Sequence, residues 1–401
     1  MGRTERASSA ARSLFFILLA AAASLQWVLQ RCVGFHPPQP WTAFLPGLSI
    51  FGAAFLLTWA AEAAEMDIPQ NISIAILALI AVLPEYAVDI YFAWEAGKNP
   101  AYTSYATANM TGANRLLIGF GWPAVLLACW WSRGIRDIHL SENNAVELST
   151  LLLATLYAFV LPFKATLSIV DTAIFLSLFA FYTYLSSKAQ VKEPELEEGP
   201  AKLIAHLPKN PRRFTIGGIF LFSALAIGLS AEPFAEGLLE AGKHWGIEEF
   251  LLVQWLAPLA SEAPEFIVAI LFSLKGKPEI GLRALVSSKV NQWTLLIGML
   301  PAAFALSSRS LMPMHLDARQ VEEIFLTSAQ SFFGLVVLMN LSFSFAEAIS
   351  LLILFSAQLF FPQASVRYIF AVAYILLGIG MLVKQRGRRG QMWRLVRRML
   401  Q

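Results

Sequence analysis

Charge is scarce in this chain of 401 residues. Only 14% of its side chains are Asp, Glu, Lys or Arg, whereas an ordinary soluble protein has about 25%. Hydrophobic residues make up 57%, and the mean hydropathy is +0.59. So few polar side chains cannot cover a soluble core, and the same numbers exclude a disordered chain or a nucleic-acid-binding arm. What remains is an all-α polytopic membrane protein, with membrane lipid as its surroundings and no nucleic acid among its partners.

Cysteine and histidine are also rare. The two cysteines, Cys32 and Cys129, form no CxxC motif and are too few for a disulfide framework. All five histidines fall in expected loops or at the ends of expected spans, and the sequence holds no HExxH or Gly-x-Ser-x-Gly motif. We therefore expect no enzyme and no cofactor, and an intramembrane enzyme is disfavoured.

Long apolar runs dominate what is present. A helix needs roughly 20 apolar residues to cross the hydrocarbon layer, and the chain offers about 12 such runs. They cover residues 13–31, 42–63, 71–95, 101–131, 145–163, 168–187, 214–236, 249–274, 280–306, 323–340, 343–361 and 367–383.

Lys and Arg residues predict the orientation of these spans. With the N-terminus in the cytoplasm and loops assigned by parity, 21 of the 30 Lys and Arg residues lie inside, as the positive-inside rule requires. The first run could also be a signal peptide, because three arginines precede it and an alanine-rich stretch follows. We favour an uncleaved span, and predict an integral protein of a bacterial inner (plasma) membrane with both termini cytoplasmic.

Two segments of the chain resemble each other. Leu83-Pro84-Glu85-Tyr86-Ala87-Val88 is similar to Ala263-Pro264-Glu265-Phe266-Ile267-Val268, and each is followed by a span with the sequence Leu-Leu-Ile-Gly, at residues 116–119 and 295–298. Proline and final glycine are 35 residues apart in one copy and 34 in the other. Glu147 and Asp171, and likewise Glu323 and Glu347, are 24 apart. These matches predict an internal repeat.

Each repeat contains five spans, an odd number, so the two copies must enter the membrane from opposite sides. The predicted organisation is two inverted five-helix repeats with one extra helix at each end. The segments are 1–41 (N-terminal extra helix), 42–187 (first repeat), 188–213 (charged cytoplasmic linker), 214–361 (second repeat) and 362–401 (C-terminal helix and basic tail).

Glu85 and Glu265 lie near the middle of their spans, where an acid costs about 3 kcal/mol and usually lines a cavity or a path. Pro84 and Pro264 remove a helical hydrogen bond, so we expect a helix break at each that exposes carbonyl oxygens to a cation. We therefore predict that Glu85 and Glu265 are ligands of a metal cation.

Further oxygen donors surround the two acids in the sequence. Carboxylate, amide and hydroxyl oxygens suit hard cations such as Na⁺ or Ca²⁺. The remaining candidate ligands are Glu262, Ser261, Asn109, Asn114, Asn291 and Ser287. Polar side chains also join membrane helices to one another, which is an equally good role for any single Ser or Thr.

Lys289 and Asp89 can modulate the charge of this site. Asp89 follows Glu85 by one turn and shares its face, although it could equally face a vestibule. Lys289 falls inside a span, and one hypothesis pairs it with Glu262 or Glu265, which would favour monovalent ions or protons over Ca²⁺. The alternative is that its long side chain reaches the membrane surface.

These residues resemble the cation/Ca²⁺ exchanger superfamily, specifically prokaryotic sodium/calcium exchanger-like membrane proteins. That family has two inverted repeats, each with a Pro-Glu in one helix and an Asn-containing motif in the next. The resemblance covers residues 42–361 and implies that Glu85 and Glu265 bind the transported cation. The Thr-Ser pair that precedes Pro-Glu in the family is Ala81-Val82 in one copy and Ser261-Glu262 in the other, so the sequence resembles a divergent member.

The function expected from the sequence is secondary active antiport. Ca²⁺ or Na⁺ would exchange against Na⁺ or H⁺ by alternating access at a carboxylate site in the midplane of the membrane. The alternatives are a transport-inactive relative and a channel. The transported inorganic cations are the other expected partners, and the oligomeric state stays open.

Overall fold

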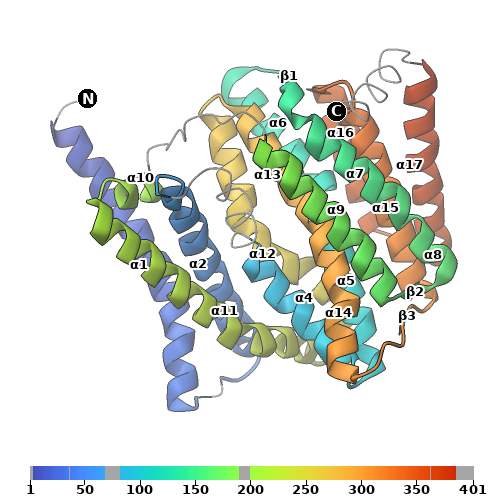
Figure 1. The fold of residues 1–401 in the computed structure, drawn as a ribbon, viewed down its shortest axis with the longest axis horizontal. Coiled ribbons are helices and arrows are strands. Elements are labelled where there is room, and N and C mark those ends of the chain that lie inside the picture. The colour runs from blue at the N-terminus through green and yellow to red at the C-terminus, as the bar shows by residue number, and fades with distance from the viewer. Residues whose placement is uncertain (1–2, 36, 68–81, 189–198, 362, 385–401) are drawn as a thin grey trace. The chain divides into compact units, whose positions relative to one another are not determined.

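The computed structural model describes residues 3–35, 37–67, 82–188, 199–361 and 363–384. It is almost entirely helical (Figure 1). Ten of the described helices are long and apolar enough to cross a membrane, and an eleventh apolar helix, α16 (Phe345–Leu359), is shorter. The predicted span 71–95 begins among residues outside the described ranges, and its described part is α4 (Leu83–Ala96). The all-helical membrane architecture predicted from the sequence is confirmed.

The chain divides into two compact units, and each unit draws on both halves of the sequence. Unit 1 comprises residues 1–91 and 186–264. Unit 2 comprises residues 92–185 and 265–401. The divisions fall inside α4, α9 (Ile169–Lys188) and α12 (Glu249–Leu274). The sequence repeats are thus not the structural units, because each unit combines segments of both.

Unit 1 is built on two long helices that pack side by side, α2 (Trp41–Ala64) and α11 (Lys209–Trp245). They are the first helices of the two predicted repeats. Their contact is lined by small residues, and the Ser230 hydroxyl donates to the Ser49 hydroxyl at 2.9 Å. Small residues let membrane helices approach closely and bond through hydroxyl groups. α1 (Arg3–Val33) packs against α2, and the indole N–H of Trp27 donates to the carbonyl of Leu229 at 3.1 Å.

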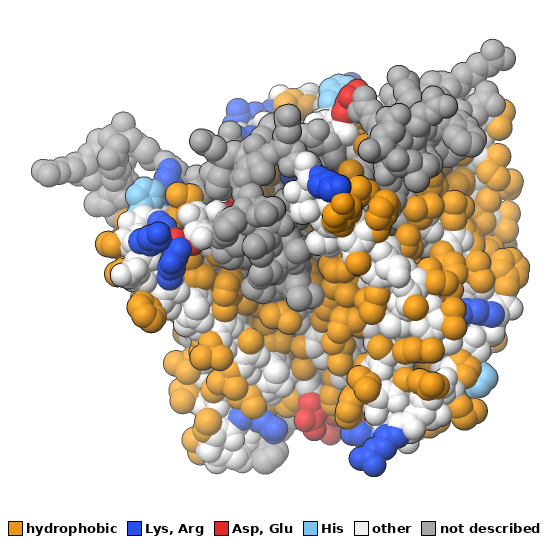
Figure 2. Space-filling model, in the orientation of Figure 1, with side chains coloured by type: hydrophobic (Ala, Val, Ile, Leu, Met, Phe, Trp, Pro, Cys, Tyr) orange, Lys and Arg blue, Asp and Glu red, His pale blue; other side chains and the backbone are white. Residues whose placement is uncertain are grey.

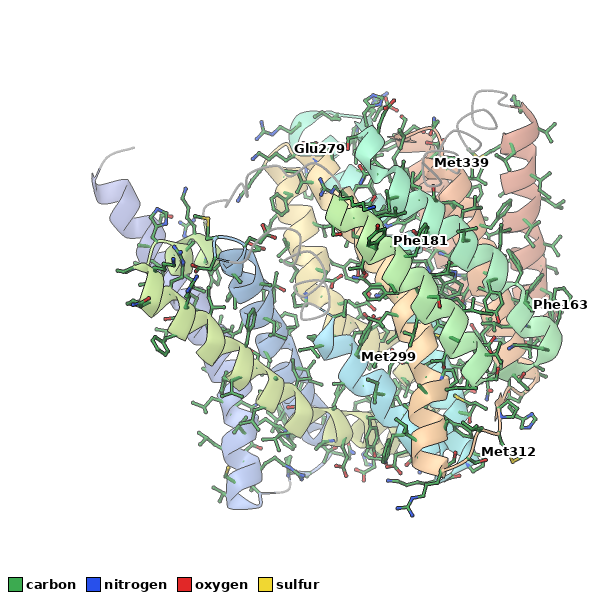
Figure 3. All side chains as sticks on the ribbon, viewed as in Figure 1. Phe163, Phe181, Glu279, Met299, Met312 and Met339 are labelled. Atoms are coloured by element: carbon green, nitrogen blue, oxygen red, sulfur yellow. The ribbon has the colours of Figure 1, made fainter. Side chains whose placement is uncertain are left out.

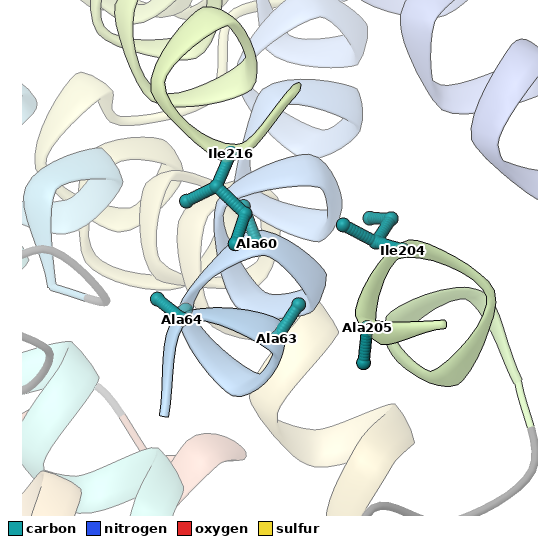
Figure 4. Close-up of a cluster of buried hydrophobic side chains, with 7 residues drawn as sticks. Ala60, Ala63, Ala64, Ile204, Ala205 and Ile216 are labelled. Atoms are coloured by element: carbon teal, nitrogen blue, oxygen red, sulfur yellow. The ribbon is translucent and has the colours of Figure 1, made fainter. Parts of the chain in front are cut away.

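The described end of the predicted linker is folded. A short helix, α10 (Pro200–Ala205), places Ile204 and Ala205 against alanines of α2 and against Ile216 of α11 (Figure 4). Arg212 joins the start of α11 to the residues that follow α2 and to α10. It donates to both carboxylate oxygens of Asp67 at 2.6 and 2.9 Å and to the carbonyl of Ala205 at 2.9 Å. α11 begins at Lys209, five residues before the predicted span, because this ion pair holds its first turn in place. Residues 189–198 of the linker and the tail from 385 lie outside the described residues.

Unit 2 carries the third, fourth and fifth spans of each repeat. In the first repeat they are η1 (Pro100–Tyr102), α5 (Thr103–Leu116), η2 (Leu117–Gly121) and α6 (Trp122–Arg133), then η3 (Glu142–Asn144), α7 (Ala145–Ala158) and α8 (Val160–Lys164), then α9. In the second they are α13 (Pro278–Asn291), η4 (Gln292–Leu296) and α14 (Ile297–Ser308), then α15 (Ala318–Leu338), then α16. The extra C-terminal helix, α17 (Ala364–Lys384), packs along α15.

Two short antiparallel ribbons join loops of opposite repeats. β1 (Asp137–His139) pairs with β4 (Ser342–Ser344), and β2 (Thr166–Leu167) pairs with β3 (Met314–His315). Each ribbon links the loop after the third span of one repeat with the loop after the fourth span of the other. Parity places those two loops on the same side of the membrane only if the repeats are inverted. The strand pairing therefore agrees with the inverted arrangement inferred from the sequence.

The repeated Leu-Leu-Ile-Gly sequence has a packing role. A Cβ on Gly119 would lie 2.2 Å from Cγ of Phe355 on α16, and a Cβ on Gly298 would lie 3.0 Å from Cβ of Phe175 on α9. The absence of a side chain at each glycine thus lets the fifth helix of the opposite repeat pack closely against it. The second repeated signal is a helix cap: Ser168 and Ser344 precede the fifth helices, and their backbone N–H groups donate to Asp171 at 2.6 Å and to Glu347 at 2.8 Å.

A buried ion network ties α5, α15 and α17 together. Arg115 and Glu323 are each 3% exposed, and their charged atoms are 2.6 Å apart. Arg367 of α17 lies 3.0 Å from Glu322 and 3.7 Å from Glu323. In a hydrocarbon environment a charge of this kind must be paired, so the network holds the extra helix against the repeat core.

Exposed large hydrophobic side chains cover much of the surface in Figure 2, as lipid-facing helices require. Figure 3 shows two of them, Phe163 of α8 and Met312, on the outside of the ribbon.

Candidate functional site

The Pro-Glu pair of the first repeat opens a helix. α4 begins at Leu83, so Pro84 lies in its first turn, where a missing N–H costs nothing. Glu85 follows in the same turn and is 3% exposed, and Asp89 is fully buried one turn later. A carboxylate is favoured there, because the N-terminal end of a helix carries partial positive charge.

The Pro-Glu pair of the second repeat lies inside a helix, and here one expectation was wrong. α12 is continuous from Glu249 to Leu274, with Pro258 and Pro264 in its interior. The expected break at Pro264 is absent because one proline removes only one N–H donor, and the hydrogen bonds on either side keep the helix together. The carbonyl of Ala260 still loses its usual donor, four residues on.

The acids of α12 are buried to different degrees. Glu262 is 1% exposed, whereas Glu265, one turn further on, is half-buried but has a buried Oε2. The Ser288 hydroxyl on α13 lies beside the Glu265 carboxylate. Neither Oε2 of Glu265 nor Oγ of Ser288 forms a hydrogen bond of ordinary geometry with a described residue. Two oxygens therefore meet in the interior of unit 2 with capacity to bind a ligand.

Asn109 on α5 is a candidate ligand with a buried side-chain amide whose hydrogen-bonding groups are unsatisfied within the described residues. Its side chain is 0% exposed, and neither its amide oxygen nor its amide nitrogen has a hydrogen-bond partner within the described parts of the chain. Its neighbours Thr107 and Thr111 instead donate to carbonyls of their own helix, at 2.5 and 2.7 Å. Since buried amides almost always have partners, Asn109 is the candidate ligand with hydrogen-bonding capacity to spare.

Asn114 binds Lys289. The Lys289 ammonium lies 2.5 Å from Oδ1 of Asn114 and 3.4 Å from its backbone oxygen, and it sits 4.1 Å from the centre of the Trp293 ring. Lys289 is 0% exposed, so the alternative in which its ammonium reaches the membrane surface is wrong. Its pairing with Glu262 or Glu265 stays a prediction.

The rest of the predicted set divides between the units. Glu85, Asp89, Ser261 and Glu262 belong to unit 1, whereas Asn109, Asn114, Glu265, Ser287, Lys289 and Asn291 belong to unit 2. Ser261 donates to the carbonyl of Ala257 at 3.2 Å, which leaves its oxygen lone pairs available. Asn291 is buried at the end of α13. The meeting of Glu85 and Glu265 is thus still a prediction.

One feature of the site is absent from the sequence prediction. The central helix of each repeat contains a π-helical turn, η2 after α5 and η4 after α13. Such turns often lie at functional sites because they re-aim the residues around them, and no residue pattern announces them. Across the described residues, no group of three or more His, Cys, Asp or Glu side chains is placed to hold a metal ion.

The sequence matches the family model described as sodium/calcium exchanger protein over residues 41–188 and 215–362. Those segments correspond to the two repeats assigned from the sequence. A comparison with curated proteins finds no match.

Three solved structures show the similarity in space. The crystal structure of the H⁺/Ca²⁺ exchanger CAX is 46% identical, matches with a TM-score of 0.92, and covers 97% of this chain and 98% of that one. Native YfkE is 16% identical, with a TM-score of 0.62 over 90% of this chain and all of that one. The sodium-calcium exchanger NCX_Mj is 16% identical, with a TM-score of 0.52 over 80% and 98%. The last two show the fold alone. With matched repeats over well over half of its length, the chain is an integral membrane protein that belongs to the sodium/calcium exchanger family.

Proposed function

We propose that this protein exchanges Ca²⁺ for protons across the membrane. The observation that carries the proposal is the set of buried side-chain oxygen atoms in unit 2, from Asn109, Glu265 and Ser288, that form no hydrogen bond of ordinary geometry with the described residues. Oxygen donors of this kind are what Ca²⁺ takes in a shell of six to eight ligands. The name of the 46% identical H⁺/Ca²⁺ exchanger supports the same pair of ions.

Carboxylates explain how one site can serve both ions. Glu85 and Glu265 would bind Ca²⁺ as carboxylates and would each accept a proton when Ca²⁺ leaves. Two protons carry the same charge as one Ca²⁺, so the loaded site stays electrically balanced in either form. An empty, doubly ionised site would be costly within the membrane, and this cost would couple the two fluxes.

Flux measurements in proteoliposomes test the proposal. Ca²⁺ loading driven by a pH gradient is expected in the wild type and should be lost in both Glu85→Gln and Glu265→Gln. Asn109→Leu should lower the Ca²⁺ flux at least tenfold. Glu279→Gln is the matched control, because Glu279 is an exposed acid in the first turn of α13. Full activity of both site variants, or flux that needs Na⁺ and moves no protons, would overturn the proposal, and non-saturable flux would indicate a channel.

The orientation is also a proposal: we infer that both termini face the cytoplasm of a bacterial inner membrane. The bias of Lys and Arg toward the loops assigned inside supports it. Cys32 is exposed at the end of α1, whereas Cys129 is buried. A membrane-impermeant maleimide added to intact cells should therefore label the wild type and fail to label Cys32→Ser. Labelling that needs permeabilised cells would reverse the orientation.

A further inference from the structure

Lys289 is a buried cation bound to groups that bind cations. Its ammonium contacts the side-chain and backbone oxygens of Asn114 at 2.5 and 3.4 Å, and it lies over the face of Trp293 at 4.1 Å. Amide and carbonyl oxygens are also the ligands of alkali ions. An aromatic face attracts a cation further.

The position of this ammonium in the repeat is informative. Asn114 lies five residues before Gly119, and Trp293 lies five residues before Gly298, so the two contacts of Lys289 come from equivalent positions of the two repeats. A group that touches both members of an equivalent pair lies close to the axis that relates the inverted repeats. Transport sites of inverted-repeat proteins lie at that axis, near the membrane midplane.

The first repeat lacks this lysine. Counting back nine residues from each glycine places Lys289 opposite Met110, which is buried and uncharged. Of these two positions, only residue 289 therefore places an ammonium close to the axis. This cation is covalently attached to the protein and cannot leave.

We propose that Lys289 acts as a built-in cation that fills a monovalent-ion position at Asn114 and thereby restricts transport to the ions bound by the carboxylates. The proposal rests on the exchange function proposed above and assigns its ion selectivity. Asn114 is then a ligand of the lysine and not of the transported ion. A transporter of this design has no need of Na⁺ or K⁺ as a third ion.

Replacement of Lys289 by methionine, the residue at the equivalent position, tests the idea. Without the ammonium, Asn114 and Trp293 should accept Na⁺ or K⁺. We expect Na⁺ or K⁺ to raise the melting temperature of purified Lys289→Met relative to a large organic cation at equal ionic strength, and the wild type to be indifferent. Ca²⁺ exchange by the variant should become dependent on Na⁺ or K⁺, changing about tenfold between the two media, because one unit of positive charge has left the site.

Controls keep the two proposals separate. Lys275→Met removes an exposed lysine and should behave as the wild type, and Lys289→Gln serves if the methionine variant does not fold. Exchange by the wild type without any Na⁺ or K⁺ effect in either Lys289 variant would overturn the inference alone. A wild type that needs Na⁺ or K⁺ would overturn it as well. Absence of Ca²⁺ exchange in the wild type would overturn the proposed function, while the melting measurement would still decide whether the position at Asn114 binds a monovalent ion.

Discussion

Gly119→Ala should destabilise the protein far more than Gly298→Ala, although both change the same position of the repeat. A Cβ at 119 would lie 2.2 Å from Cγ and 2.5 Å from Cβ of Phe355, whereas a Cβ at 298 would lie 3.0 Å from Cβ of Phe175. Rotation of the Phe355 ring cannot relieve the first clash, because the Cβ of that residue is fixed to the backbone of α16. The whole helix must move.

Two terms set the magnitude. Overpacking of a well-filled interior costs about 1–3 kcal/mol, and the clearance at 119 places that variant at the upper end. Alanine recovers up to about 1 kcal/mol over glycine through its helix propensity. We therefore expect Gly119→Ala to lose about 2 kcal/mol of unfolding free energy and Gly298→Ala to change it by less than about 1 kcal/mol.

Equilibrium unfolding in detergent micelles measures both variants under one condition. Phe355→Ala completes a double-mutant cycle. It removes the ring but keeps the Cβ, so it should restore part of the stability that Gly119→Ala loses. Equal losses for the two glycine variants would refute the reasoning, as would full additivity of Gly119→Ala and Phe355→Ala.

Three further predictions concern charges and caps. Glu323→Gln should lower the free energy of unfolding by about 3–5 kcal/mol, because Arg115 keeps a buried charge without its partner. Melting of the Arg115→Met, Glu323→Gln double variant should show strong coupling between the two substitutions. Simple additivity of their effects would contradict the pairing. Ser344→Ala should cost about 1 kcal/mol in the same assay, since it removes a capping box at the start of α16, and no change would mean that the cap is redundant. The Arg212 guanidinium holds the pKa of Asp67 below its usual value of 3.8. The ion pair therefore stabilises the folded state fully above pH 3.8, and this stabilisation is lost as the pH falls through the lowered pKa. The melting temperature of Asp67→Asn should lack this dependence on acid pH. A pH profile equal to that of the wild type would exclude a stabilising role for the Arg212–Asp67 ion pair.

The membrane-spanning helices and the inverted repeat could be predicted from the sequence because both follow from local rules. Apolar length determines which segments cross the membrane, and a repeated sequence implies a repeated fold. The ends of elements were less predictable, since tertiary contacts set them. α11 starts early because Asp67, far away in sequence, binds Arg212, and α12 continues through Pro264 because one lost hydrogen bond is not a break.

The candidate site was predictable only by residue type. Asn109 and Asn114 look alike in the sequence, yet the first amide has no hydrogen-bond partner among the described residues and the second binds a lysine 175 residues away. No pattern along the chain separates the two, because the difference is made by a neighbouring helix. The π-helical turns were unpredictable for a similar reason: they depend on how the central helices pack, not on their own residues.

The repeat also shows which similarities carry function. Gly119 and Gly298 admit the fifth helix of the opposite repeat, and the Ser-x-x-acid pairs cap those helices, so two of the matches that reveal the repeat serve the fold alone. The Pro-Glu match differs in structure, at the start of α4 in one copy and in the middle of α12 in the other. Lys289 has no charged equivalent, because Met110 occupies that position in the first repeat. We look for selectivity in the positions where the copies disagree, and Lys289 against Met110 is one such position, with a difference of one charge.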